Sequence, residues 1–385
     1  MTISAESRRW WLALRLVPQI NRVRFYTLID HFQTPEAVFG ATAKEIAALR
    51  GFNEELARAV LEAPRSAAWQ EELAEMERRG VRLLTLDDED YPENLRQSSF
   101  PPPLLYVRGQ LDAMDRFSVA IIGSRRATQY GRMVAEAFAG RLARAGLAIV
   151  SGFARGIDSI AHRAALDAGG RTIGVLGNGL SICYPQENAR LGEAIVERGA
   201  LVTEYPMRTA PDRFNFPERN HLIATLALGT LVVEAAEKSG ALITAREALE
   251  ENRFVFALPG DITRETSRGT NALIQSGAKL VQSAEDVLAE MQHLLKGLMK
   301  EAGATAGPSG AGGEAGAGLP APDDLTPDER MVYELLRREP QYFDVLLARL
   351  DPERFGVQEL SAVLLTLEMK RRIRQMPGRL YAILA

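Results

Sequence analysis

Short apolar runs alternate with helical stretches through the centre of the chain, from about residue 118 to residue 282. Each run is apolar throughout and ends in a glycine or a polar residue, which is typical of strands in a parallel sheet covered by helices on both faces. The pattern predicts an α/β fold with a Rossmann-like, doubly wound, mostly parallel sheet, in which ligands bind at the carboxyl ends of the strands. The expected strands are residues 119–122, 147–150, 173–176, 201–203, 231–233 and 254–258.

A helical pattern occupies the first 80 residues, where apolar side chains recur three or four positions apart. Within it, residues 17–21 and 49–53 form a weak repeat, which predicts a SAM-like or helix-hairpin-helix-like domain. In helix-hairpin-helix turns, backbone N–H groups bind a phosphate at a helix start. Gln19 stands where the first turn would have its glycine, and this favours a small bundle that caps or docks over one that binds phosphate.

Two further segments follow the α/β core. Residues 301–324 contain 18 Gly, Ala, Pro or Ser residues in 24 positions, a composition typical of a flexible linker. The last 60 residues predict helices at 327–338, 343–350 and 357–370, followed by a hairpin at 373–383. Three helices and a hairpin in this order form a winged helix. The expected domains are a helical domain (1–80), a Rossmann-like domain (81–295), a Gly/Ala-rich linker (296–325) and a winged helix (326–385).

The composition excludes several classes of protein. The 385 residues include 46 Lys and Arg and 50 Asp and Glu, a net charge of −4, so the chain does not coat nucleic acid through bulk charge. Its one cysteine, Cys183, excludes an intramolecular disulfide and a multi-cysteine zinc site, and indicates a reducing compartment. The longest nearly apolar run, 222–233, is too short to cross a bilayer. We expect a cytoplasmic protein without a membrane segment.

The charge counted by segment changes this picture. Residues 118–192 hold nine Arg and four Asp or Glu, a net charge of +5. The loop after the first expected strand, 123–131, combines a glycine, a hydroxyl and arginines ahead of a helix, and the loop at 151–158 repeats this chemistry. Such a combination suits an oxyanion such as a phosphate. Because the carboxyl ends of neighbouring parallel strands meet at one edge of the sheet, the two loops predict one cationic site.

Aromatic residues occur in glycine- or proline-containing segments near these loops: Phe153, Tyr184, Phe214 and Phe216. Exposed rings would supply stacking platforms for the bases of a single strand, at about 1 to 3 kcal/mol per base. Buried rings would belong to the core. The sequence leaves both alternatives open for each ring.

Other functional patterns are weak. The glycines at 177 and 179 fail the G-x-G-x-x-G fingerprint because Ile182 stands at the third glycine position, and no P-loop sequence occurs. The four histidines are scattered without metal spacing, and His162 is expected to be a packing or capping residue. Glu204 and Glu234, at strand ends, are the only carboxylates placed like catalytic groups, and either could equally hold an arginine in position.

A series of short motifs runs through about residues 100–285. They are Gly123-Ser-Arg125, Ser151-Gly-Phe-Ala-Arg-Gly-Ile-Asp158, Ala161-His162, Val175-Leu-Gly-Asn-Gly179, Tyr184-Pro185, Phe216-Pro-Glu-Arg219-Asn220, Val233-Glu-Ala235, Ser239-Gly-Ala-Leu-Ile-Thr-Ala245, Phe256-Ala-Leu-Pro-Gly260, Gly269-Thr-Asn271-Ala-Leu-Ile274 and Gly277-Ala278. Together they closely resemble the DNA-processing protein A (DprA/Smf) family. The order of helical domain, Rossmann-like core and winged helix is also similar to the three-domain form of that family.

The resemblance implies a function. It implies a homodimer that binds single-stranded DNA, protects incoming DNA in natural transformation, and loads the RecA recombinase onto DNA coated by single-strand-binding protein. It also implies that the protein is not an enzyme. We therefore expect no catalytic residue, no metal and no cofactor.

The resemblance also implies the residues of the site. The DNA contacts are expected at Gly123, Ser124, Arg125, Arg126, Ser151, Gly152, Phe153, Arg155, Phe214, Phe216, Arg219 and Asn220. The dimer surface is expected around Asn271, Ile274 and Leu280.

Two positions depart from the expected pattern. His221 stands where an arginine is expected, so one phosphate contact should be weaker. The third helix of the winged helix has Gln358, Glu359 and Ser361 before a mostly apolar run, and positive charge comes only at 370–372 and 374. A base-reading helix so poor in cations favours protein docking or an auxiliary role in DNA binding.

Two other functions stay open. The first is an enzyme related to the lysine-decarboxylase-like phosphoribohydrolases, whose signature is Pro-Gly-Gly-x-Gly-Thr-x-x-Glu. Residues 229–234 echo only the end of this signature, lack its Pro-Gly-Gly, and place the glutamate one residue too far from the glycine. The second is a structural adaptor that acts through the winged helix, in which case deletion of residues 326–385 would abolish function and spare DNA binding.

Overall fold

The computed structural model describes residues 5–292, 294–295, 325–338, 341–350, 355–370, 372–376 and 380–383. The chain divides into two units, residues 1–303 and 304–385, which we describe separately. The expected linker, 296–325, lies outside the described residues except for Leu325. No helix within these ranges is both long enough and apolar enough to span a bilayer.

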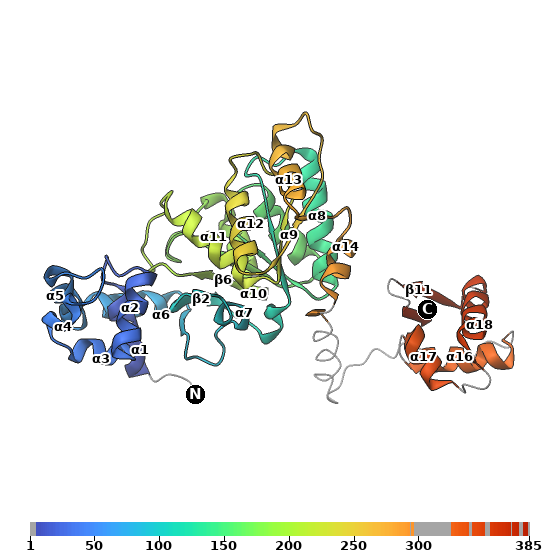
Figure 1. Cartoon of the computed structure of the whole chain (residues 1–385), viewed down its shortest axis with the longest axis horizontal. Coiled ribbons are helices and arrows are strands. Elements are labelled where there is room, and N and C mark those ends of the chain that lie inside the picture. The colour runs from blue at the N-terminus through green and yellow to red at the C-terminus, as the bar shows by residue number, and fades with distance from the viewer. Residues whose placement is uncertain are drawn as a thin grey trace. The chain divides into compact units, whose positions relative to one another are not determined.

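A nine-stranded sheet forms the centre of the first unit (Figure 1). Its strand order is β1-β2-β6-β5-β4-β3-β7-β8-β9. The strands from β6 to β9 in this order are parallel; at one end β2 pairs antiparallel with β6, and β1 pairs antiparallel with β2. This is the mostly parallel, doubly wound sheet that the apolar runs predict. The strands are β1 (Val81–Thr85), β2 (Leu104–Gly109), β3 (Ser118–Ile122), β4 (Ala148–Ser151), β5 (Thr172–Val175), β6 (Ala200–Thr203), β7 (Gly229–Val232), β8 (Phe254–Ala257) and β9 (Lys279–Leu280).

Helices cover both faces of the sheet and divide the core into two layers. In β3, Ala120 and Ile122 belong to the apolar cluster that includes α7, α11 and α12, whereas Val119 and Ile121 belong to the cluster that includes α8, α9 and α14. All residues of β3 to β7 are buried, as a sheet covered on both faces requires. The helices are α7 (Glu93–Arg96), α8 (Gln129–Arg144), α9 (Ile157–Asp167), α10 (Ala189–Arg198), α11 (Asn215–Leu226), α12 (Gly240–Glu250), α13 (Glu265–Gln275) and α14 (Ala284–Glu290).

The six expected strands are all present, with ends that shift by at most two residues. Three further strands, β1, β2 and β9, were not predicted. β2 follows the prolines at 101–103 and pairs antiparallel with both β1 and β6, and β9 has only two residues. These strands lie at or near the edges of the sheet, where pairing with a neighbour defines a strand more than its own apolar pattern does.

Six helices precede β1 and share an apolar core with the β1 edge of the sheet. Leu12 and Phe25 of these helices are buried in the same cluster as Leu83 of β1 and Tyr106 of β2. The helical domain and the sheet therefore pack within one unit. The helices are α1 (Ala5–Arg15), α2 (Arg22–Phe32), α3 (Pro35–Gly40), α4 (Ala43–Ala47), α5 (Glu54–Glu62) and α6 (Ala68–Arg78).

The weak repeat in the helical domain corresponds to two similar helix starts. The side-chain oxygens of Asn21 and Asn53 accept hydrogen bonds from backbone N–H groups in the first turns of α2 and α5. Arg24 joins the two turns, because its guanidinium donates to the carbonyl oxygens of Gln19 (2.8 Å) and Gly51 (3.0 Å). Asparagine side chains thus occupy both helix starts, which supports packing over phosphate binding for this domain.

The second unit has the winged-helix architecture that the sequence predicts. Its three helices accompany a sheet of order β10-β12-β11, of which the two-residue strand β10 was not expected. Lys370 forms an ion pair with the buried carboxylate of Glu329 at 2.8 Å. One of the cations expected after the third helix of the winged helix is therefore neutralised within the unit. Arg371 lies outside the described residues. The elements are α16 (Pro327–Arg338), β10 (Gln341–Tyr342), α17 (Phe343–Arg349), α18 (Val357–Met369), β11 (Ile373–Met376) and β12 (Leu380–Ile383).

His162 is a packing residue in the interior, as the sequence suggested. It is fully buried on α9, and its Nδ1 lies 2.6 Å from the hydroxyl of Thr172. That hydroxyl donates to the carbonyl oxygen of Ile149, so Nδ1 carries the proton and donates to Thr172. Nε2 is buried without a hydrogen-bond partner in the structure. Burial lowers the pKa of His162 to about 3, and the ring is therefore neutral at ordinary pH.

Replacement of His162 by phenylalanine should change the pH dependence of stability. The folded pKa of about 3 lies below the ordinary value of 6.5, so the unfolded chain takes up the proton first as the pH falls. Between pH 7 and pH 4.5 the wild type should lose about 2 to 3 kcal/mol of unfolding free energy that His162→Phe does not lose. Urea unfolding at both pH values measures this difference. His31→Phe, at an exposed position, is the control and should retain the wild-type pH dependence.

Candidate nucleic-acid interface

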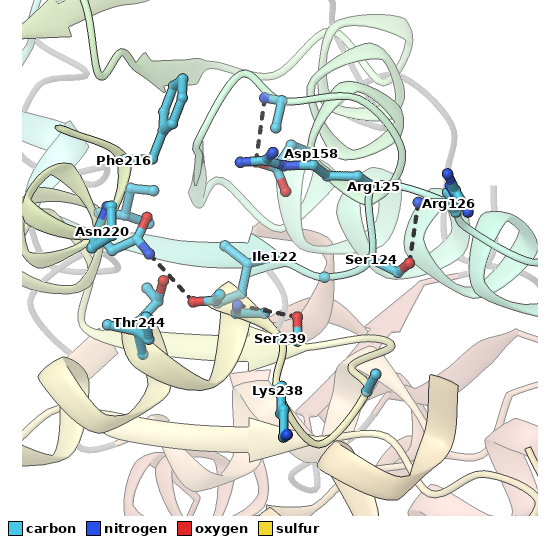
Figure 2. A pocket seen from close by; sticks show the side chains of 18 of the residues that line it. Ile122, Ser124, Arg125, Arg126, Asp158, Phe216, Asn220, Lys238, Ser239 and Thr244 are labelled. Carbon is cyan, nitrogen blue, oxygen red and sulfur yellow. Dashed lines mark hydrogen bonds between the residues drawn. The ribbon is translucent and has the colours of Figure 1, made fainter. Parts of the chain in front are cut away.

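A cleft of about 1160 Å³ opens at the carboxyl ends of the parallel strands (Figure 2). It lies where the strand order reverses, because its walls come from the segment after β3 and the segment after β7. Open α/β sheets bind ligands at the point where the strand order reverses. The two loops that leave the neighbouring strands there lead to helices on opposite faces of the sheet, and a crevice opens between the loops. The fold therefore places this cleft where the sequence predicts a binding site.

The loop after β3 supplies two arginines to one wall. The hydroxyl of Ser124 accepts a hydrogen bond from the backbone N–H of Arg126 at 3.1 Å. The carbonyl oxygen of Ser124 accepts from the N–H of Ile157 at 3.2 Å, and Gly156, with a φ of 76°, leaves no room for a Cβ beside that carbonyl. The loop is thus held against the start of α9, and the exposed side chains of Arg125 and Arg126 line the cleft.

An aromatic cluster lies beside these arginines. The rings of Tyr184 and Phe216 stack with their centroids 5.8 Å apart, and the Arg125 guanidinium lies 5.4 Å from the centroid of Phe216. The ring of Phe214 is 66% exposed, and the guanidinium of Arg213 lies 4.7 Å from its centroid. Arginines and exposed rings therefore occur together on this side of the cleft, as the phosphates and bases of a single strand would require.

The opposite wall was not predicted. Lys238, Ser239, Gly240 and Thr244 line the cleft at and near the start of α12, and Arg268 lines it from α13. The hydroxyl of Ser239 caps α12. Lys238-Ser239-Gly240 repeats the combination of cation, hydroxyl and glycine ahead of a helix that marked the first two loops. The same argument, applied after the expected strand at 231–233, would have found this wall.

Arg219 is an expected DNA contact whose side chain is buried, although it is among the residues that line the cleft. Its side chain is 5% exposed, and its guanidinium donates to the carbonyl oxygens of Gly152 (2.5 Å) and Val175. Asp158 is buried beside it, and Gly152 leaves no room for a Cβ between these two side chains. Burial lowers the pKa of Arg219 to about 10, and burial raises the pKa of Asp158 although the charge of Arg219 opposes this rise. Arg219 therefore ties the ends of β4 and β5 to α11.

Two more expected contacts face inward, and a third, Asn220, lies in the lining of the cleft. The hydroxyl of the fully buried Ser151 donates to the carbonyl oxygen of Ile121 at 2.6 Å. The ring of Phe153 is 1% exposed and belongs to the core shared with the helical domain. The amide of Asn220 donates to the carbonyl oxygen of Gly240 at 3.3 Å and so joins α11 to α12. The side chains of Ser151 and Phe153 are packed at the end of β4, so the structure does not present them at the surface of the cleft, and their contact with DNA stays a prediction.

Arg155 and His221 have partners within the protein. Arg155 is exposed, pairs with the carboxylate of Glu187 at 2.9 Å, and lines a smaller hollow beside the cleft. The Nδ1 of His221 lies 3.1 Å from the carboxylate of Glu247, and His221 is not among the residues that line the cleft. The expected effect of His221 on a phosphate contact therefore has no support in the geometry.

The expected dimer residues differ in their surroundings. The amide of Asn271 donates to the carbonyl oxygen of Gly260 (2.9 Å) and accepts from its N–H (3.1 Å). Ile274 is partly buried against the core. Leu280 is 41% exposed on β9, which is the last strand at one edge of the sheet. Leu280 is thus the member of this set that offers apolar surface at a sheet edge.

The two strand-end carboxylates have structural partners. Both carboxylate oxygens of Glu204 accept from Arg22, each at 2.6 Å, so Glu204 holds an arginine. Glu234 is 3% exposed and accepts from the N–H (3.0 Å) and the hydroxyl (2.5 Å) of Thr128 at the start of α8. Gly131, in the first turn of α8, leaves no room for a Cβ beside that carboxylate. A carboxylate therefore fills the helix start at which a dinucleotide-binding fold holds phosphate.

Comparisons with known proteins identify the family of the chain. The family model described as DNA recombination-mediator protein A matches residues 82–292, and the model of the DprA winged helix domain matches residues 317–379. Protein Smf of Synechocystis sp. is 33% identical over 396 residues, which cover 98% of each chain. The chain belongs to the DNA-processing protein A family.

Further members of the family support the assignment. DNA processing protein DprA of Streptococcus pneumoniae is 45% identical over 205 residues, which cover 53% of this chain and 72% of that protein. The X-ray structure of DprA from the same organism matches with a TM-score of 0.66 and 34% identity, over 75% of this chain and 99% of that chain. The mostly parallel sheet is thus the fold of a DNA-processing protein A. No group of metal-ligating side chains occurs among the residues that the structure describes.

Substitutions of Arg219 and Arg126 should change the unfolding free energy by different amounts. Arg219→Met removes a buried cation, leaves Asp158 uncompensated, and should lower the unfolding free energy by about 3 to 5 kcal/mol. Arg126→Ala, at an exposed position, should change it by less than about 0.5 kcal/mol. Urea unfolding measures both effects. Equal stability of the two variants would contradict a structural role for Arg219.

Proposed function

We propose that the cleft binds single-stranded DNA. Its phosphates would lie between the loop at 123–126 and the start of α12 at 238–240, and its bases would stack beside Tyr184, Phe214 and Phe216. The observation that carries this proposal is the position of the exposed Arg125 guanidinium, 5.4 Å from the centroid of Phe216. A cation and an aromatic face at this separation suit a phosphate and the base attached to it.

The geometry favours a single strand over a duplex. Base faces in a duplex are stacked on one another, so the exposed rings of Phe214 and Tyr184 could not reach them. Stacking is also tolerant of sequence, because every base has a π-face. We expect binding with little sequence preference and with a salt dependence that reflects a few phosphates.

The biological role follows from the family. We propose that the protein protects incoming single strands in natural transformation and recombination, and loads the RecA recombinase onto DNA covered by single-strand-binding protein. This role is one of binding without catalysis, and its partners act in the cytoplasm. The buried contacts of Glu204 and Glu234 support it, because both carboxylates hold structural partners outside the lining of the cleft.

The competing phosphoribohydrolase function has weaker support. It requires the glutamate that ends residues 229–234 to reach a nucleotide, whereas Glu234 is buried against Thr128. Release of free base from nucleoside monophosphates, dependent on Glu234, would nevertheless overturn the binding proposal. We expect no base release.

The winged helix is proposed to have a protein-docking or auxiliary DNA role. The ion pair of Lys370 with Glu329 supports this, because it withdraws a cation from the end of α18. Among the described residues of α18, the exposed positions are Glu359, Ser361, Ala362 and Thr366, which carry no positive charge.

Arg125→Ala should weaken the binding of oligothymidine by about tenfold, because one phosphate contact and its cation–π partner are lost. The slope of log K against log salt should fall by about 0.7, the value for one phosphate of a single strand. Fluorescence anisotropy over a range of salt concentrations measures both. The control is Arg141→Ala, which breaks an ion pair with Glu285 at the other end of α8 and should bind like the wild type. An unchanged affinity and slope for Arg125→Ala would reject the phosphate assignment.

The dimer is proposed to form at the β9 edge. An exposed edge strand offers unpaired backbone groups, and Leu280 adds apolar surface there. Leu280→Lys should shift the protein from dimer to monomer in sedimentation velocity without loss of fold. Leu249→Lys, at a 52% exposed leucine on α12, is the matched control and should remain dimeric. A wild type that sediments as a monomer would refute the proposed interface.

A further inference from the structure

Residues 204–214, which we call the base-side loop, connect β6 to α11 and end at Phe214. Pro211 and Arg213 of this loop line the cleft, and the ring of Phe214, which packs against Arg213, is 66% exposed. The base-side loop contains no helix or strand. Its path therefore depends on contacts with neighbouring elements.

The helical domain holds the start of the base-side loop. Arg22 of α2 donates to both carboxylate oxygens of Glu204 at 2.6 Å, and the two side chains are only 17% and 15% exposed. Arg15 of α1 donates to the backbone carbonyl oxygen of Glu204 at 3.2 Å. Two arginines from the helical domain thus fix both the side chain and the backbone of the first residue of the loop.

The helical domain also holds the middle of the base-side loop. The backbone N–H of Met207 donates to the carboxylate of Glu72 on α6 at 2.6 Å, and both residues are buried. Next to it, the guanidinium of Arg208 lies 3.6 Å from the carboxylate of Glu75. These contacts, with that of Glu204, anchor the loop at two separate places on the helical domain, which is the blue part of Figure 1.

The α/β core holds the other side of the base-side loop. The N–H of Gly179 donates to the carbonyl oxygen of Thr209, and the N–H of Ser181 donates to that of Met207, each at 2.9 Å. Gly179 leaves no room for a Cβ beside the carbonyl of Met207. The base-side loop is therefore held between the helical domain and the core by contacts within the chain.

We propose that the helical domain positions the base-binding side of the cleft, with Arg22 and Glu72 as positioning residues that act through the base-side loop. The proposal rests on the function proposed above. Among the described residues, the helical domain contributes none to the lining of the cleft, so its effect on DNA is indirect. A loop that is ordered before binding loses less conformational entropy when a strand docks. The phosphate side, at 123–126 and 238–240, lies on loops after other strands and should be unaffected.

The test compares two ligands on the full-length protein. One is an oligothymidine that carries a single 2-aminopurine, whose fluorescence reports stacking, and the other is an abasic strand of the same length. Arg22→Gln should bind oligothymidine about tenfold more weakly, because the stacking of about one base is lost. The same loss of stacking should reduce the quenching of 2-aminopurine. The affinity of Arg22→Gln for the abasic strand should remain that of the wild type. Arg22→Lys keeps the charge and should restore part of the affinity.

A double substitution and a control sharpen the test. Since Arg22 acts through Glu204, the variant Arg22→Gln with Glu204→Gln should bind no more weakly than Arg22→Gln alone. The matched control is Arg82→Gln on β1, which breaks an ion pair of 2.9 Å with Asp90 and should bind like the wild type. Thermal unfolding verifies that each variant is folded. If Arg22→Gln is unfolded at the assay temperature, Arg22→Lys decides the comparison.

The outcomes separate this proposal from the one on which it rests. Wild-type affinity of a folded Arg22→Gln for oligothymidine overturns the positioning role and leaves DNA binding intact. Equal losses for oligothymidine and the abasic strand also overturn it, because they show a general structural effect. Failure of the wild type to bind oligothymidine overturns the proposed function itself.

Discussion

The cleft depends on the hydrogen bonds that the buried guanidinium of Arg219 donates to the protein backbone. The guanidinium binds the carbonyl oxygens of Gly152 and Val175, and so sets the spacing between the ends of two neighbouring strands. A buried cation costs several kcal/mol unless it is paired, and Asp158 supplies the opposite charge. Because Arg219 fixes the rotation of α11, Phe216 and Asn220, three positions before it and one after it, both line the cleft. A buried cation thus positions neighbouring residues that line the cleft.

The fold could be predicted from the sequence because a parallel sheet covered on both faces leaves continuous apolar runs, as in β3 and β7. The site could be predicted in part, because glycine, hydroxyl and arginine together after a strand mark an anion site, as at Gly123, Ser124 and Arg125. What could not be predicted is the direction of individual side chains. Phe153 has a φ of 56°, in the left-handed region, and its ring is buried in the core although its neighbours in the chain form the strand-end loop.

The composition of a segment also does not show which of its charged side chains form ion pairs. The net charge of +5 over residues 118–192 counts every arginine equally. In the structure Arg141, Arg155 and Arg171 form ion pairs with carboxylates, two of which lie outside that segment, at Glu285 and Asp115. The cleft draws on Arg125 and Arg126, and it gains Lys238 and Arg268 from a part of the chain that the count did not cover. The segment with the local positive charge therefore borders the cleft, but the charge count did not distinguish the residues that line it from those in ion pairs.

The carboxylate of Glu234 occupies the start of α8, and this affects which phosphate-bearing molecules of the cell could bind there. Free mononucleotides and dinucleotide cofactors are abundant in cells, and folds of this class commonly hold their phosphates at the first helix start. Here the hydrogen bonds from Thr128 are already made to the buried carboxyl group of Glu234. A nucleotide phosphate at that position would therefore meet a carboxylate instead of free hydrogen-bond donors.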